Sequence, residues 1–190
     1  MFQIRIHGRG GQGVVTAAEL LSVAAFLDGE HAQAFPSFGS ERTGAPVVSF
    51  CRVDDKEIRL REPILEPDAV IVQDATLLKA VDVFQGLRPD GYLLINTSRS
   101  FVELHLGDLI ERLPAGHART IAATELALEH IGRPVPNVVL LGAFAALTGL
   151  VQFHSMTTAI RQAFPGKVGD ANVAAATAAY AAVTAASGTR

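Results

Sequence analysis

A glycine-rich turn near the N-terminus is the feature that most restricts the fold of this chain. Residues Gln3–His7 alternate apolar and polar side chains in the pattern of a strand, and Val14 to about Asp28 places apolar residues at helical spacing. Between the two segments stands Gly8–Gly13, with the sequence G-R-G-G-Q-G. The chain therefore passes from a strand directly through a glycine turn into a helix.

The glycine spacing within this turn indicates a site for a phosphate-bearing cofactor. Gly8, Gly10 and Gly13 follow the G-x-G-x-x-G pattern, in which the glycines allow a tight turn, close approach of a phosphate, and packing of helix against strand. The N-terminus of the following helix offers amide groups and a partial positive charge to an anion. Arg9 and Gln12 add side-chain donors. The alternative is a turn that merely joins strand to helix, although four glycines in six residues cost chain entropy without adding packing.

The nicotinamide interpretation of the turn is weaker than a general phosphate interpretation. It requires an acidic residue about 20 positions later, at the end of the second strand, to bind the ribose hydroxyls. Here that segment is His31–Phe35, which has no carboxylate, while Asp28 and Glu30 precede it. A P-loop is excluded because no Gly-Lys-Ser/Thr follows.

The remaining pattern predicts an α/β fold in one domain over residues 1–190. Further strands are expected at His31–Phe35, Val47–Val53, Ile58–Leu60, Ala69–Val72, Tyr92–Asn96 and Arg119–Ala122. Further helices are expected at Ala75–Phe84, Leu106–Leu113, Thr124–His130, Asn137–Gln152, Ser155–Phe164 and Asp170–Ala186. This order predicts a Rossmann-like parallel or mixed sheet flanked by helices, with a helical C-terminal part.

Composition and charge exclude several classes of function. Hydrophobic residues make up 49 % and charged residues 18 %, which fits either a surface covered by partner chains or a well-packed monomer. A net charge of −3 without a basic cluster argues against nucleic-acid binding. The longest apolar stretch, Val138–Val151, is too short to span a membrane, and the N-terminus does not have the pattern of a signal peptide, so a cytoplasmic protein is expected.

Neither a metal site nor a catalytic group is predicted. Cys51 is the single cysteine, so the chain forms no internal disulfide and holds no cysteine-bound iron–sulfur cluster or structural zinc. The six histidines lack metal-ligand spacing, and no nucleophile has a recognisable base. Asp68 and Asp74 flank a predicted strand and are expected to cap or to turn the chain.

A second loop, Phe35–Pro46, is richer in functional groups than a plain connection requires. If the sheet is parallel at this point, the loop lies beside the glycine turn at the carboxyl edge of the sheet. Arg42 would then pair with a phosphate, and Ser40 and Thr43 would donate hydrogen bonds. The alternative is a surface loop with an internal Glu41–Arg42 salt bridge.

The two loops together resemble the gamma subunit, or gamma domain, of the pyruvate:ferredoxin and related 2-oxoacid:acceptor oxidoreductases. The resemblance rests on G-R-G-G-Q-G at Gly8–Gly13 and on F-G-S-E-R-T-G-A-P-V at Phe38–Val47. It extends to Asp68-Ala69-Val70 with Asp74, Gly91–Asn96, and Pro136-Asn137 with Gly142. The length also matches a separate gamma subunit.

This resemblance implies a role in the oxidative decarboxylation of a 2-oxoacid to acyl-CoA, without activity of the isolated chain. In the family, thiamine diphosphate with Mg lies between alpha and beta subunits, and [4Fe-4S] clusters are held by cysteine-rich chains such as a ferredoxin-like delta subunit. Electrons pass to ferredoxin, or to NAD through another subunit. The gamma module is implicated in binding coenzyme A. The implied binding residues are Gly8, Arg9, Gly10, Gly11, Gln12, Gly13, Ser40, Glu41, Arg42 and Thr43.

The oxoacid itself is left open by the sequence. The ending Gly44–Val47 is similar to the pyruvate branch, while 2-oxoglutarate, branched-chain oxoacids and aryl glyoxylates remain alternatives. Two other functions also remain: a free-standing NAD- or flavin-binding oxidoreductase, and a purely structural assembly subunit.

Overall fold

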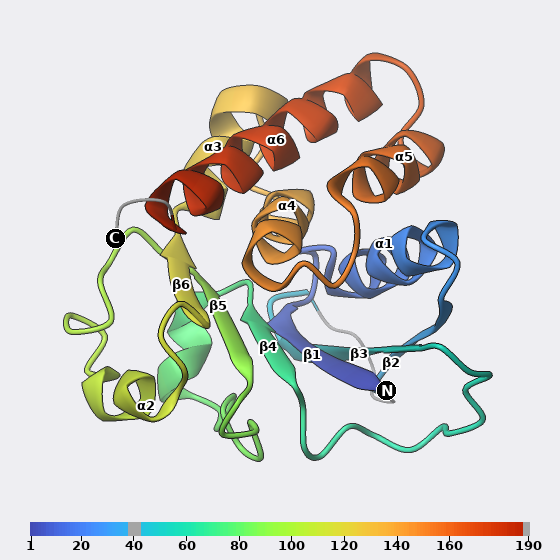
Figure 1. Ribbon diagram of the computed structural model, residues 1–190. Coiled ribbons are helices and arrows are strands. Elements are labelled where there is room, and N and C mark those ends of the chain that lie inside the picture. Colours follow the sequence, from blue (N-terminus) through green and yellow to red (C-terminus); the bar gives the residue numbers. More distant parts are fainter. Residues whose placement is uncertain (38–42, 188–190) are drawn as a thin grey trace.

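A six-stranded mixed sheet forms the centre of the molecule, with strand order β2-β3-β1-β4-β5-β6 (Figure 1). The computed structural model describes residues 1–37 and 43–187. The strands are β1 (Phe2–Arg9), β2 (His31–Pro36), β3 (Pro46–Asp54), β4 (Ala69–Val72), β5 (Tyr92–Asn96) and β6 (Ala118–Ile121). The helices are α1 (Val14–Leu27), a 3-10 helix (Ala75–Lys79), α2 (Gly107–Arg112), α3 (Ala123–Ile131), α4 (Asn137–Thr148), α5 (Phe153–Ala163) and α6 (Lys167–Ser187). The predicted fold class is confirmed.

The sheet changes its direction of growth between β1 and β4. Strands β1, β4, β5 and β6 are parallel, whereas β3 is antiparallel to both β1 and β2. From β1 the chain first builds β2 and β3 on one side and then crosses to build β4 to β6 on the other. The boundary between β1 and β4 is therefore the switch point, beyond whose carboxyl edge ligands of open α/β sheets bind.

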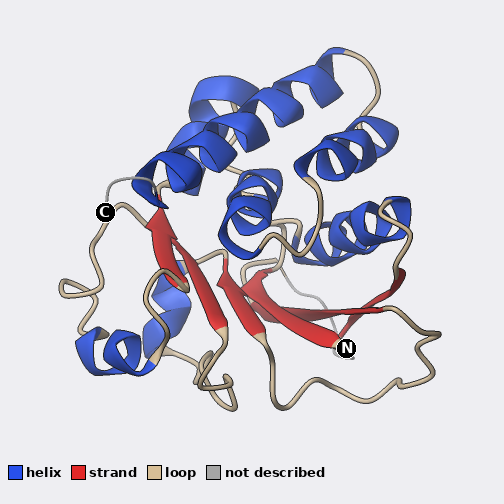
Figure 2. Ribbon diagram, viewed as in Figure 1, coloured by secondary structure: helices blue, strands red, loops and turns tan. Residues whose placement is uncertain are grey.

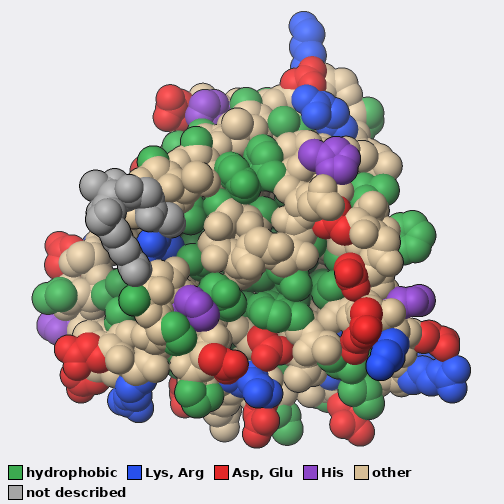
Figure 3. Space-filling model, in the orientation of Figure 1, with side chains coloured by type: hydrophobic (Ala, Val, Ile, Leu, Met, Phe, Trp, Pro, Cys, Tyr) green, Lys and Arg blue, Asp and Glu red, His purple; other side chains and the backbone are tan. Residues whose placement is uncertain are grey.

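The two faces of the sheet are covered differently (Figure 2). Helices α1, α3, α4, α5 and α6 bury one face, to which β1 contributes Ile4 and Ile6. The other face of β4 to β6 packs against two segments, one with the 3-10 helix and one with α2. On the side shown in Figure 3, charged side chains lie mainly along the lower rim, while hydrophobic and uncharged groups occupy the centre.

Two buried arginines of β1 and β3 bind irregular segments of the chain by donating to their backbone carbonyls. The Arg5 guanidinium donates to the carbonyls of Val83 (3.0 Å) and Gln85 (2.6 Å), and Arg52 donates to the carbonyl of Glu62 (2.6 Å). The strand predicted at Ile58–Leu60 is absent because this segment lies in such contacts, with Leu60 O accepting from Arg52, and joins no strand. The helix predicted at Ala75–Phe84 is likewise reduced to the 3-10 helix, followed by turns.

Helix α4 differs at both ends from its prediction. The sequence also predicts Asn137 as the cap of this helix, but Asn137 is its first helical residue, and its Oδ1 accepts from the amide of Val138. The helix ends at Thr148 and not near Gln152, because Gly149 takes a left-handed conformation with φ 63°. None of the helices in the described part of the chain is long and apolar enough to cross a bilayer.

The alanine-rich helix α6 packs on α4, and several of its alanine side chains lie buried on that side of the helix. Ala175, Ala176 and Ala179 are fully buried. The two helices approach so closely that a Cβ added to Gly142 would lie 2.2 Å from the carbonyl oxygen of Ala176. The high alanine content thus serves close packing within the chain.

Gly142→Ala is expected to lower the free energy of unfolding by about 1–3 kcal/mol, because backbone atoms of α6 leave no space for the methyl group. Denaturant unfolding measures the effect. Gly107→Ala is the matched control, since a Cβ there meets no atom within 4 Å, and it should be neutral or slightly stabilising. Equal stability of the two variants would contradict the close packing of α4 on α6.

Candidate functional site

The glycine turn leaves β1 at the switch point and leads directly into α1. A Cβ on Gly8 would lie 2.5 Å from Val14 Cγ2, so this glycine lets the helix approach the strand. Gly11 and Gly13 have positive φ values of 93° and 70°, which favour glycine. A Cβ on Gly13 would lie 2.4 Å from Asn137 Nδ2, so Gly13 lets the start of α1 pack against α4. The predicted role of Gly13, packing of the helix against the strand, is wrong.

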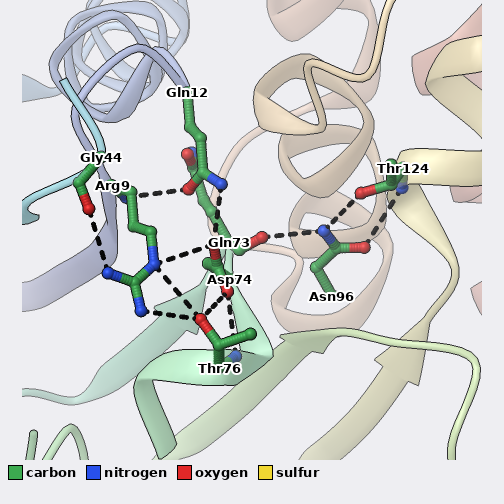
Figure 4. Close-up of polar contacts among 8 residues, drawn as sticks. All are labelled: Arg9, Gln12, Gly44, Gln73, Asp74, Thr76, Asn96 and Thr124. Atoms are coloured by element: carbon green, nitrogen blue, oxygen red, sulfur yellow. Dashed lines mark hydrogen bonds and ion pairs between the residues drawn. The ribbon is translucent and has the colours of Figure 1, made fainter. Parts of the chain in front are cut away.

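Side chains from three segments fix the turn to the end of β4 (Figure 4). Gln12 Oε1 accepts from the Arg9 amide (2.8 Å), and Gln12 Nε2 donates to Asp74 Oδ2 (2.9 Å). Arg9 Nε lies 3.2 Å from the same carboxylate oxygen, and Arg9 also donates to Thr76 Oγ1 and to the carbonyl of Gly44. Arg9 and Gln12, predicted as ligand donors, therefore also shape the turn from within.

Asp74 is the common acceptor of this network. Burial by itself would raise the pKa of Asp74, but hydrogen bonds from Thr76 and Gln12 and the charge of Arg9 together lower it. Asp74 also caps the 3-10 helix by accepting from the Thr76 amide (2.9 Å). Its predicted role as a cap is confirmed, and its carboxylate is ionised at neutral pH.

The neighbouring strand ends are joined through Asn96. Its Nδ2 donates to the carbonyl of Gln73 (2.8 Å) and to Thr124 Oγ1 (2.8 Å), and its Oδ1 accepts from the Thr124 amide (Figure 4). This contact links β4 and β5 to the start of α3. The carboxyl edge of the sheet is thus braced on both sides of β4.

The second loop returns to the glycine turn, as predicted, but by a different route. The amide of Gly10 donates to the carbonyl of Ala45 (2.9 Å), and the amide of Gly44 donates to the carbonyl of Gly10 (3.1 Å). Strand β2 runs in the same direction as β1, and antiparallel β3 begins at the edge where β2 ends. A hairpin, and not a parallel connection, therefore brings the loop to this edge.

The predicted residues of the second loop are only partly visible. Thr43 is exposed and forms a bridge with Gly10, which places it beside the turn. Ser40, Glu41 and Arg42 lie outside the described residues. Because the Gly10 amide and carbonyl bond this loop and the Gln12 amide bonds the Arg9 carbonyl, the amides of the turn that remain for a ligand, within the described residues, are those of Gly11, Gly13 and the first turn of α1. The first helical bond runs from the Ala17 amide to the Gly13 carbonyl.

The turn borders a cavity of about 520 Å³, here called the turn cavity. Gly11, Gly13 and Thr16 line this cavity together with two cations from distant parts of the chain, Arg133 and Lys167. Neither cation is predicted as a site residue from the sequence, because both lie more than 100 residues from the turn and belong to no local motif. A second cavity of about 580 Å³ lies beyond Thr76, Thr97 and Arg99.

No group of three His, Cys, Asp or Glu side chains that could hold a metal gathers within residues 1–37 and 43–187. Cys51 is fully buried in β3, and burial raises its pKa to about 12. This thiol is therefore neither a nucleophile nor a ligand in the folded chain.

Comparison with known proteins gives this geometry a family. The sequence pattern described as pyruvate ferredoxin/flavodoxin oxidoreductase matches residues 3–182. The chain belongs to this family. The predicted resemblance is thereby confirmed over nearly its whole length.

Relatives of this oxidoreductase-family chain have closely similar lengths. "Pyruvate synthase subunit PorC" of Methanothermobacter marburgensis is 51 % identical over 95 % of this chain and 96 % of its own. "Pyruvate/ketoisovalerate oxidoreductases common subunit gamma" of Pyrococcus abyssi is 48 % identical over the same shares. The crystal structure of pyruvate oxidoreductase subunit PORC from Thermotoga maritima is 37 % identical, with a TM-score of 0.78 over 95 % of both chains.

The same fold also occurs as part of a longer chain. In 2-oxoglutarate:ferredoxin oxidoreductase from Magnetococcus marinus, a structure with 2-oxoglutarate, coenzyme A and succinyl-CoA bound, 31 % of the chain matches 97 % of this one. The TM-score is 0.74 and the identity 17 %, so the match shows a shared fold.

Asp74→Asn is expected to destabilise the folded chain by about 1–3 kcal/mol at neutral pH, because it removes the charged acceptor of the turn. The folded pKa of Asp74 is lowered, so its contribution is lost as the pH falls from about 3.9 through the folded value. Denaturant unfolding should therefore show a difference from wild type at pH 7 that shrinks at pH 3. Glu129→Gln, exposed on α3, serves as control. A difference independent of pH would rule out this role of the carboxylate.

Proposed function

We propose that this chain is the gamma subunit of a multi-subunit 2-oxoacid:ferredoxin oxidoreductase, and that it contributes to coenzyme A binding at the glycine turn. The family match and the names and lengths of the relatives support the subunit role. The chain itself carries no catalytic residue in this proposal. Its contribution to the reaction is to bind and orient the acyl acceptor and to help assemble the complex.

The observation that carries the coenzyme A proposal is that exposed Gly11 and the half-buried Gly13 and Thr16, at the N-terminus of α1, line the turn cavity. Coenzyme A has a pyrophosphate and a 3′-phosphate, and the amides of Gly11 and of the first turn of α1 suit such anions. Gly11 has no Cβ, and space is open around it: an added Cβ would meet no atom within 4 Å. The turn is held rigid by Asp74, so it can bind a phosphate without reorganising.

The redox cofactors belong to other chains in this proposal. Alpha and beta subunits would hold thiamine diphosphate with Mg, and a ferredoxin-like delta subunit would hold [4Fe-4S] clusters. The buried Cys51 supports this division, because the single thiol of the chain is inaccessible to a cluster. Ferredoxin, or NAD through another subunit, would accept the electrons.

The geometry counts against a free-standing NAD- or flavin-binding enzyme. In the dinucleotide-binding fold, the strand after the first helix pairs beside β1 and ends with the ribose-binding acid. Here antiparallel β3 occupies the place beside β1, and β2 ends at Pro36 without a carboxylate. A purely structural subunit is the remaining alternative, and the turn itself provides the test.

The test is a matched pair of substitutions, Gly11→Asp and Gly11→Asn, in the assembled complex. The two side chains have the same size and similar tolerance of positive φ, so they differ mainly in charge. Gly11→Asp should raise the KM for coenzyme A about tenfold or more above that of Gly11→Asn, because a carboxylate then faces a phosphate. Steady-state kinetics with a 2-oxoacid measures the effect.

Both variants must co-purify with the partner subunits as the wild type does. If the two variants then show the same KM for coenzyme A as the wild type, the chain is a structural subunit and the proposal fails.

A further inference from the structure

We infer that the turn cavity binds the phosphate-bearing nucleotide end of coenzyme A, with Arg133 and Lys167 as the groups that select the phosphates. This inference rests on the proposed function and adds to it which end of the coenzyme lies here and which side chains recognise it. Residues of the glycine turn and the two cations line the same cavity.

Charge in the cavity is of one sign. Arg133 and Lys167 are exposed, and neither side chain has an ion-pair or hydrogen-bond partner within the described part of the chain. No acidic side chain is among the described residues that line the cavity. The acidic residue of the first turn of α6, Asp170, lies 3.6 Å from Arg161 in an ion pair and is not part of the lining.

Helix termini add to this positive charge. The cavity is lined by residues at the N-terminal ends of three helices: Gly13 and Thr16 of α1, Asn137 of α4, and Lys167 with Asn172 of α6. Each N-terminus carries a partial positive charge from its unpaired amides. Two cations without a partner in the described part of the chain, together with three helix N-termini, give the turn cavity a positive potential that favours binding of an anion.

The remaining lining favours an organic anion over a simple ion. Four apolar side chains are part of the lining, Ile131, Val135, Phe164 and Val168, and Val168 is 57 % exposed. Asn137, nearly buried, belongs to the same lining. A lining with both apolar side chains and cations suits a nucleotide, whose base packs on the apolar side chains while its phosphates meet the cations.

The second cavity lacks this combination. Its arginine, Arg99, donates to the backbone carbonyl of Glu103. Glu103 also lines this cavity and brings a carboxylate to it. An anion there would meet a negative charge and a cation that already has a partner. The turn cavity is therefore the better phosphate site on this chain.

The experiment measures KM and kcat for coenzyme A and for dephospho-coenzyme A, which lacks the 3′-phosphate, in the assembled complex. Arg133→Gln and Lys167→Gln should each raise the KM for coenzyme A about tenfold with kcat unchanged, as expected for loss of a charge-assisted hydrogen bond. The residue that meets the 3′-phosphate should have little effect on dephospho-coenzyme A. Arg161→Gln, the matched control outside the cavity, should leave the KM unchanged.

Binding to the separate 190-residue chain gives a second readout. Calorimetric titration with adenosine 3′,5′-bisphosphate should show binding that both variants weaken, and inorganic phosphate should compete poorly. Equal competition by inorganic phosphate would overturn the nucleotide assignment.

The outcomes separate this inference from the proposed function. If the double variant of Arg133 and Lys167 leaves the KM for coenzyme A unchanged while Gly11→Asp raises it, the cavity assignment is wrong and the turn assignment stands. If neither change alters the KM, both are wrong.

Discussion

The contact between Arg9 and Asp74 joins the two halves of this molecule. It links the end of β1 to the end of β4, at the point where the sheet changes its direction of growth. Gln12 bonds the same carboxylate and thereby fixes the glycine turn, while Arg9 also bonds the returning loop at Gly44. The direction of α1, and hence of its free amides, depends on this one charged acceptor.

A fixed turn at the switch point is what the proposed role requires, in which this chain binds the acyl acceptor and contributes no catalytic group. Acyl transfer requires an acceptor that is held in position, and positioning needs preorganised donors more than reactive side chains. In the proposed role, the half-buried network around Asp74 would supply that preorganisation, and the close packing of α4 on α6 would support the helices whose N-terminal residues line the turn cavity. The exposed side chains of Arg133 and Lys167 would then bind the phosphates without a rearrangement of the turn or of the helices.

The sequence predicted those elements that rest on local patterns. The glycine turn, the parallel strands β4 to β6 and the helical C-terminal part follow from spacing over a few residues. Part of the segment before β4 has a local pattern typical of a strand, but its conformation depends on Arg5 and Arg52, which donate hydrogen bonds to its carbonyls from distant positions in the sequence. The role of Gly13 was also misassigned, since its constraint comes from Asn137, more than 100 residues away. Arg133 and Lys167 carry no local signal and emerge only from the folded arrangement.

Hydrogen–deuterium exchange of the assembled complex, with and without coenzyme A, tests the central claim most directly. The amides of Gly11 and of the first turn of α1 should exchange more slowly when coenzyme A is bound, because its phosphates accept from them. Unchanged exchange at residues 11–16, with protection confined to other subunits, would show that the glycine turn does not bind the coenzyme.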